Sequence, residues 1–173
     1  METLLALTVT MIALTAAMRL LTVASSASAR AVVRGELTEC ARTAADVITV
    51  NIQRASEIKL TTDGNNTLER LDLTEPEGKF TILYDKDASV FPSGLHRLYF
   101  SGSDVNPTNE LASNLADIKI TADSPNTLSI EIVTDNTVTT SADSANKRPG
   151  LTIDPVLIRA SADIAGKAVS INQ

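Results

Sequence analysis

The sequence predicts an α+β fold in which one long N-terminal helix packs on a small antiparallel β-sheet. Three observations predict it. Residues 3–18 contain no charge, proline or glycine, and residues 29–58 repeat apolar side chains at intervals of three and four. Residues 59–173 then alternate short β-rich runs with turn residues. With 173 residues and a net charge of −6, the chain suits one core domain, divided into a helix over 1–58 and a β domain over 59–173.

Composition excludes several classes of function. A single cysteine, Cys40, cannot form an intramolecular disulfide, and a single histidine, His96, argues against a histidine metal site. The acidic balance argues against a general nucleic-acid binder. The sequence holds no glycine-rich phosphate loop, nucleophile elbow or cluster with metal-ligand spacing. We therefore predict no catalytic residue, cofactor or metal, and an enzyme is the least favoured class.

Residues 1–24 are the apolar part of the expected helix. Leucine, alanine and methionine favour helix, and the apolar side chains surround it on all sides, which is typical of a membrane or a fully buried core. Extended through residue 24, the run reaches the roughly 30 Å of a hydrocarbon core, with Arg19 snorkelling or paired. The residues expected in the membrane or in the core of an assembly are Leu4, Leu5, Leu7, Ile12 and Leu14.

Three interpretations of this apolar segment compete. The small residues 27–29 (ASA) resemble a signal-peptidase site, but the start carries Glu2 with no basic residue, and Arg19 interrupts the apolar run. A helix buried in a soluble domain is a second interpretation, although a domain this small rarely surrounds such a helix. We favour a membrane helix that stays on the protein, because a carboxylate such as Glu2 beside an apolar helix is costly unless paired and marks a contact. Glu2 also suits the positive end of the helix dipole.

Residues 25–58 are the amphipathic part of the same helix. Their apolar side chains recur at three- and four-residue spacing and form one stripe, while the charged residues mostly face elsewhere. A sheet with one face to bury needs a cover, and this stripe is the available one. The residues expected to pack between helix and sheet are Val33, Leu37, Ala44, Val47 and Ile48, with Cys40, Ala55 and Ile58 on the same stripe.

The remainder of the chain reads as short strands joined by turns, which predicts a mostly antiparallel sheet. Turns are expected wherever Asp, Asn, Pro and Gly cluster, and residues 138–150 are expected to form a surface loop. Residues 164–173 receive no assignment. The expected turns are 63–66, 75–78, 91–94 and 123–126, and the expected strands are 57–62, 67–74, 79–84, 95–101, 115–122, 127–134 and 154–159.

The start of the chain resembles the mature N-terminus of type IV pilins and pseudopilins. Members of that family open with an aromatic residue, Thr-Leu, a variable residue, a glutamate and a leucine-rich run, and residues 1–7 (METLLAL) are similar from the variable position onward. Residues 46–55 (DVITVNIQRA), 82–84 (ILY), 95–97 (LHR) and 111–115 (LASNL) are similar to segments of minor pilins and J-type pseudopilins. The basic leader and about three mature residues of the pattern are missing, so we expect the upstream coding sequence to read in frame through such a leader.

The resemblance implies a pilin-like fold and a structural role. Such subunits are held in the bacterial inner membrane by a single helix, with the β domain outside the cytoplasm, and then enter a cell-surface or periplasmic filament. The implied partners are other pilin or pseudopilin subunits, the prepilin peptidase and the assembly platform, and cleavage and N-methylation would require the missing segment. Carried over, the family glutamate falls on Glu2, which would pair with the N-terminal amine of a neighbouring subunit.

A second function class stays open. A secreted or membrane-tethered β-rich adhesin or binding domain, released or anchored by its N-terminal helix, would show the same apolar start and the same strands. The upstream reading frame and neighbouring genes for an assembly ATPase or other pilin-like proteins distinguish it from a subunit of a pilus, competence or type II secretion filament.

Overall fold

A computed structural model describes residues 2–85, 97–102, 109–135, 137–138 and 151–172. The chain forms two compact units, Met1–Gly35 and Glu36–Gln173. The boundary between them lies inside the long helix, whereas the sequence places the division at residue 58. The expected α+β class, with one long N-terminal helix and several β-strands, is confirmed.

Helix α1 spans Glu2–Arg54 and is 53 residues long, far above the mean helix length of about 11–12 residues. It lacks proline throughout, and its start and end suit the helix dipole, with Glu2 in the first turn and Arg54 in the last. The expected extension to Ile58 is wrong. Ile58 belongs to strand β1 (Glu57–Thr62), where it pairs with Leu73 and is fully buried. Its apolar side chain also matched the three- and four-residue spacing of the helix, which is why the sequence pattern included it.

A residue far away in the sequence supplies hydrogen bonds to the last carbonyl groups of α1. The Lys167 ammonium donates to the carbonyl oxygens of Ile52 at 2.6 Å and Gln53 at 2.5 Å, which are among the last carbonyls of the helix without an intrahelical partner. Gly166, with φ of 74°, occupies the preceding turn, which favours a residue without Cβ. This contact positions the final strand of the chain beside the end of the helix.

The larger sheet has six strands in the order β11-β1-β2-β3-β4-β5. Neighbouring strands along the chain pair antiparallel, while β11 pairs with β1 in parallel, so the sheet is mixed rather than purely antiparallel. Besides β1, its strands are β2 (Leu68–Glu75), β3 (Gly78–Asp85), β4 (Arg97–Ser101), β5 (Asn109–Ser113) and β11 (Ala168–Asn172).

A second sheet has three antiparallel strands in the order β10-β7-β6. They are β6 (Leu115–Ser124), β7 (Thr127–Thr134) and β10 (Leu157–Asp163), and a separate two-residue pair joins β8 (Thr137–Val138) to β9 (Leu151–Thr152). Asn114, with φ of 58°, is the single residue between β5 and β6, and its left-handed backbone carries the chain from one sheet into the other. The single small sheet expected from sequence is therefore corrected to two main sheets.

Most strand expectations are confirmed in place, and one is shifted. The strand over 127–134 matches β7, while the strand expected over 154–159 begins later, as β10. Strands β5 and β11 were not expected as strands. The turn expected over 91–94, His96 and most of the loop expected over 138–150 lie outside the described residues.

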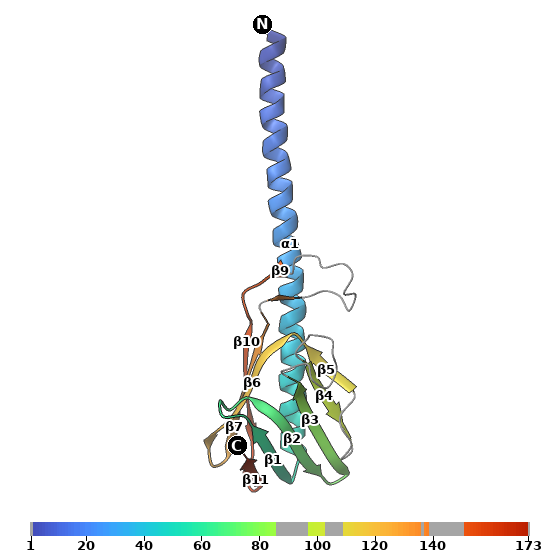
Figure 1. The fold of residues 1–173 in the computed structure, drawn as a ribbon, viewed down its shortest axis with the longest axis vertical. Coiled ribbons are helices and arrows are strands. Elements are labelled where there is room, and N and C mark those ends of the chain that lie inside the picture. The colour runs from blue at the N-terminus through green and yellow to red at the C-terminus, as the bar shows by residue number, and fades with distance from the viewer. Residues whose placement is uncertain (1, 86–96, 103–108, 136, 139–150, 173) are drawn as a thin grey trace. The chain divides into compact units, whose positions relative to one another are not determined.

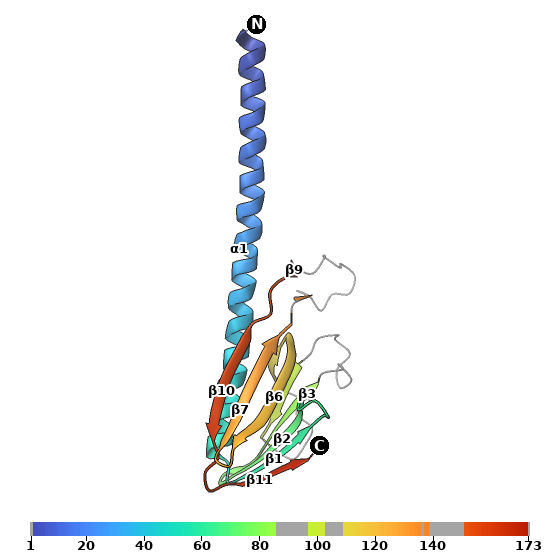
Figure 2. The ribbon, with the colours of Figure 1, turned by 90° about the vertical axis from the view of Figure 1, so that its left-hand side faces the viewer.

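The unit Glu36–Gln173 has one core built from three elements. Figures 1 and 2 show the second half of α1, from Glu36 to Arg54, running alongside both sheets. Ile48 and Ile52 of the helix belong to the same buried cluster as Leu71 of the larger sheet and Ile130 of the smaller one. Side-chain hydrogen bonds link the sheets: the Tyr84 hydroxyl donates to the Leu115 carbonyl at 2.7 Å, and the Thr67 hydroxyl donates to Asp117 at 2.9 Å. The helix therefore covers a continuous apolar surface made by both sheets.

Candidate functional site

The first half of α1, from Glu2 to Gly35, exposes a long apolar surface. Within Ala6–Arg54 the helix contains an apolar window, none of it buried, that is long enough to span a membrane or to act as a signal anchor. Of the residues expected in this surface, Leu7, Ile12 and Leu14 are exposed by 60%, 70% and 61%, while the side chains of Leu4 and Leu5 lie outside the description. The other large exposed side chains here are Val9, Met11, Met18, Leu20, Leu21, Val23 and Val32.

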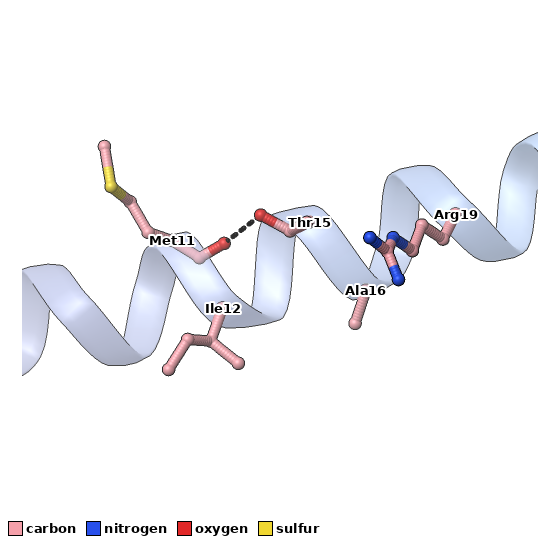
Figure 3. Close-up of a pocket in the computed structure, with 5 residues that line it drawn as sticks. All are labelled: Met11, Ile12, Thr15, Ala16 and Arg19. Carbon is pink, nitrogen blue, oxygen red and sulfur yellow. Dashed lines mark hydrogen bonds between the residues drawn. The ribbon is translucent and has the colours of Figure 1, made fainter.

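Four hydroxyl groups of this segment bond to their own helix. Thr10, Thr15 and Thr22 donate to the carbonyl oxygen four residues earlier at 2.6–2.7 Å, and Ser26 donates to the Val23 carbonyl at 2.9 Å. Figure 3 shows this bond between Thr15 and Met11. Because each of these hydroxyls already has an acceptor, the segment can leave water without losing those hydrogen bonds.

Two charged side chains stand out on this apolar surface. Glu2 lies in the first turn, and Arg19 is the only charged residue between Glu2 and Arg30. Both are exposed, and neither forms an ion pair with any residue that the structure describes. The Arg19 guanidinium runs back along the helix towards Ala16 and closes one end of a shallow apolar groove (Figure 3). In an apolar environment each of these charges needs a partner.

The second half of α1 performs the packing role expected of it. Leu37, Ala44 and Ile48 are buried as expected, while Val33 and Val47 are only half-buried. The sequence interpretation missed three buried helix residues, Ala41, Ala45 and Ile52. All three lie three or four residues from an expected member of the stripe, so their burial is compatible with the same periodicity. Cys40 is half-buried and carries no disulfide.

A charged groove lies on the outer face of β1, β2 and β3. Asp72 is opposite Lys59 on β1 and Thr81 on β3. Arg70 Nε donates to both Asp72 oxygens at 2.9 Å, and the Thr81 hydroxyl donates at 2.8 Å. Partial burial raises the pKa of Asp72, but hydrogen bonds from Arg70 and Thr81 and the positive charges of Arg70 and Lys59 outweigh it and hold the pKa below its ordinary value. The groove is lined by Glu57, Lys59, Arg70, Asp72, Leu73, Thr74, Lys79 and Thr81.

Neither this groove nor the rest of the described chain presents a metal centre. Among the described residues, no three His, Cys, Asp or Glu side chains are grouped as metal ligands would be. The Asp72 carboxylate is already held by two donors of its own sheet. The geometry therefore assigns these charges to the stability of the sheet, and we assign the groove no ligand.

Comparison of the chain with protein-family models, with curated proteins and with solved structures finds no match. The helix itself is therefore the basis for a functional proposal. Its residues 36–54 pack into the core of the β-rich unit, and its residues 2–24 expose an apolar surface that carries Glu2 and Arg19.

Proposed function

We propose that the chain is a structural subunit of a type IV pilus, competence or type II secretion filament, of the minor pilin or pseudopilin kind. The observation that carries the proposal is the exposed apolar half of α1, continuous in sequence with the half that is the core of the β-rich unit. One continuous helix would thus combine an anchor and a structural support.

The apolar half needs two successive environments. A helix that is apolar on all sides is stable in a bilayer, where its backbone is satisfied internally. The same surface, once out of the bilayer, is stable only against other apolar helices, since large exposed apolar patches associate. The hydroxyls already bonded to the backbone suit both environments.

The resemblance supplies the remaining roles in this proposal. The helix holds the chain in the bacterial inner membrane as a single pass, with the β-rich unit outside the cytoplasm, before the subunit joins a filament of other subunits. Glu2 marks the contact made on assembly. The prepilin peptidase and the assembly platform are the proposed partners of the N-terminal segment.

A comparison of two helix glutamates in a bacterial host tests the proposal. Glu2 and Glu39 are both exposed on α1, Glu2 in the apolar half and Glu39 beside the buried stripe. The Glu2→Leu chain should stay in carbonate-washed membranes with its β-rich unit protected from cytoplasmic protease, yet give at least tenfold fewer cross-linked multimers. The Glu39→Leu chain, the matched control, should assemble as the wild type does.

Two outcomes would contradict the proposal. Equal multimer formation by the Glu2→Leu and Glu39→Leu chains would remove the role of Glu2 in assembly. Recovery of the wild-type chain as a soluble, single-copy secreted protein that lacks the apolar segment would instead support a β-rich binding domain delivered by a signal sequence.

A further inference from the structure

We propose that Arg19 of one copy, in place of the N-terminal amine that the resemblance implies, pairs with Glu2 of a second copy, and that the two parallel helices are offset by seventeen residues. The inference rests on the proposed function, since it names the partner and the register of the assembling helix. Seventeen residues, from position 2 to position 19, correspond to about 25 Å along a helix.

Charge complementarity identifies the partner as a second copy. Arg19 lies on an apolar helix whose large side chains are exposed around it, and it has no ion-pair partner among the described residues. Glu2 is the only carboxylate in residues 1–35. The two sites cannot pair within one straight helix, because about 25 Å separates them along the axis. A neighbouring copy brings a Glu2 to the height of Arg19 and neutralises both charges.

The side chains around the two charges fit the same offset. On a helix, positions i, i+4, i+7, i+11 and i+14 share one face. Three of the four side chains that follow Glu2 on its face are alanines, and each lies at the height of a larger side chain on the face that begins at Arg19. The fourth, Val9, lies at the height of a serine. The facing pairs are Ala6 with Val23, Val9 with Ser26, Ala13 with Arg30, and Ala16 with Val33.

Insertion of every copy into the membrane in one orientation, which the proposed function implies, makes the helices of two copies parallel. Small residues opposite large ones let two helix backbones approach closely. An antiparallel pair joined by the same two charges would also place Ala6 and Ala13 opposite larger side chains, and it would place Val9 opposite Ile12. The residues concerned are exposed in the described unit, apart from Val33, which is half-buried.

The offset also determines what kind of assembly forms. Each copy uses its Glu2 face towards one neighbour and its Arg19 face towards another, so the interface is heterologous. Heterologous contacts with a constant axial displacement do not close and generate an open helical filament. The register of the assembly is therefore encoded by two charges of opposite sign at different heights on one apolar helix.

Disulfide mapping between copies tests the offset. Full-length chains in dodecyl maltoside micelles carry Cys40→Ser, and one set carries Val9→Cys while a differently tagged set carries Ser26→Cys. The offset predicts that 9–26 disulfides form at least tenfold more than 9–9 disulfides, which report unshifted helices. A third set with Ile12→Cys reports the antiparallel pair through 9–12 disulfides. Predominant 9–9 or 9–12 disulfides would overturn the offset.

Charge reversal tests the pair itself. Arg19→Glu and Glu2→Arg alone should each reduce 9–26 disulfides at least tenfold, and the double reversal in one chain should restore them. Arg30→Glu is the matched control, since the offset places Ala13 rather than a carboxylate opposite Arg30, and it should retain them. Failure of the double reversal to restore them would overturn the pair.

The outcomes separate the two proposals. Cysteine variants with Glu2 and Arg19 unchanged that give no disulfides between copies at any of these positions, while remaining folded, would refute assembly through α1 and with it the proposed function. Chains that associate strongly but through 9–9 disulfides would overturn only the Arg19–Glu2 offset.

Discussion

Truncating one buried and one exposed side chain of α1 separates the two roles of this helix. Ile48 lies in the second half and is fully buried in the core shared with both sheets, while Leu14 lies in the first half and is 61% exposed. Both are large aliphatic residues on one continuous helix, and alanine favours helix at either position. Any difference between Ile48→Ala and Leu14→Ala therefore reports packing.

The expected magnitudes follow from burial. Ile48→Ala removes three buried carbons, worth about 0.8 kcal/mol each in transfer free energy, and leaves a cavity that raises the loss to about 3–4 kcal/mol. With a urea slope of about 2 kcal/mol per M, the unfolding midpoint should fall by about 1.5–2 M. Leu14→Ala should change the free energy of unfolding of the β-rich unit by less than about 0.5 kcal/mol.

Tyrosine fluorescence provides a local readout of the β-rich unit. The chain has no tryptophan, and its tyrosines, Tyr84 and Tyr99, are both buried in strands of the larger sheet. Urea titrations of the two variants and the wild type in detergent micelles would compare their midpoints. Equal shifts for Ile48→Ala and Leu14→Ala, or a larger shift for Leu14→Ala, would refute the division of α1 into a core half and an exposed half.

Three further predictions concern polar contacts of the β-rich unit. Lys167→Met should lower the free energy of unfolding in urea by about 1–3 kcal/mol, because two helix carbonyls lose a charged donor, whereas Lys119→Met should change it by less than about 1 kcal/mol. The pKa of Asp72 is lower folded than unfolded, so its contribution is complete above about pH 4 and disappears as pH falls through the folded pKa. Urea titrations below pH 5 should therefore show a steeper loss of stability in the wild type than in Asp72→Asn, and parallel curves would contradict this. Tyr84→Phe should cost about 1–2 kcal/mol by the same titration, since it removes a buried hydrogen bond to Leu115; an unchanged midpoint would show that this bond contributes nothing.

The elements dictated by local pattern were predictable from sequence. The long helix follows from a proline-free run with apolar spacing of three and four residues, and β7 follows from the alternation of Leu128, Ile130 and Ile132. The end of the helix was not predictable in the same way. Ala55 and Ile58 fit the helical stripe, but pairing of β1 with β2 uses Ile58, and that contact depends on residues more than ten positions away.

Long-range pairing accounts for the other differences. Strand β11 pairs in parallel with β1, across more than a hundred residues, and most of its side chains are exposed, so its own sequence carries little hydrophobic signal. The division into two sheets depends on the left-handed backbone of Asn114. Asparagine tolerates this conformation, but the packing of the two sheets determines that it is adopted.

In the helix, too, residues marked by local sequence were predictable, and residues whose role depends on tertiary packing were not. Glu2 and the apolar residues around it were evident, because a lone carboxylate before a charge-free run is a strong local signal. Ala41 and Ala45 were missed as core residues because alanine is common on both buried and exposed helix faces, and only the packed sheets show which face is covered.

Photolabelling in a bilayer tests the central claim, that the two halves of α1 serve different surroundings, most directly. The full chain would be reconstituted in phosphatidylcholine vesicles with a lipid-soluble carbene probe, irradiated and mapped by mass spectrometry. Labels are expected within the exposed residues 6–24, and none on the buried helix residues Ala41, Ala44, Ala45, Ile48 and Ile52. Labels on the buried residues, or an unlabelled first half in chains bound to the vesicles, would contradict it.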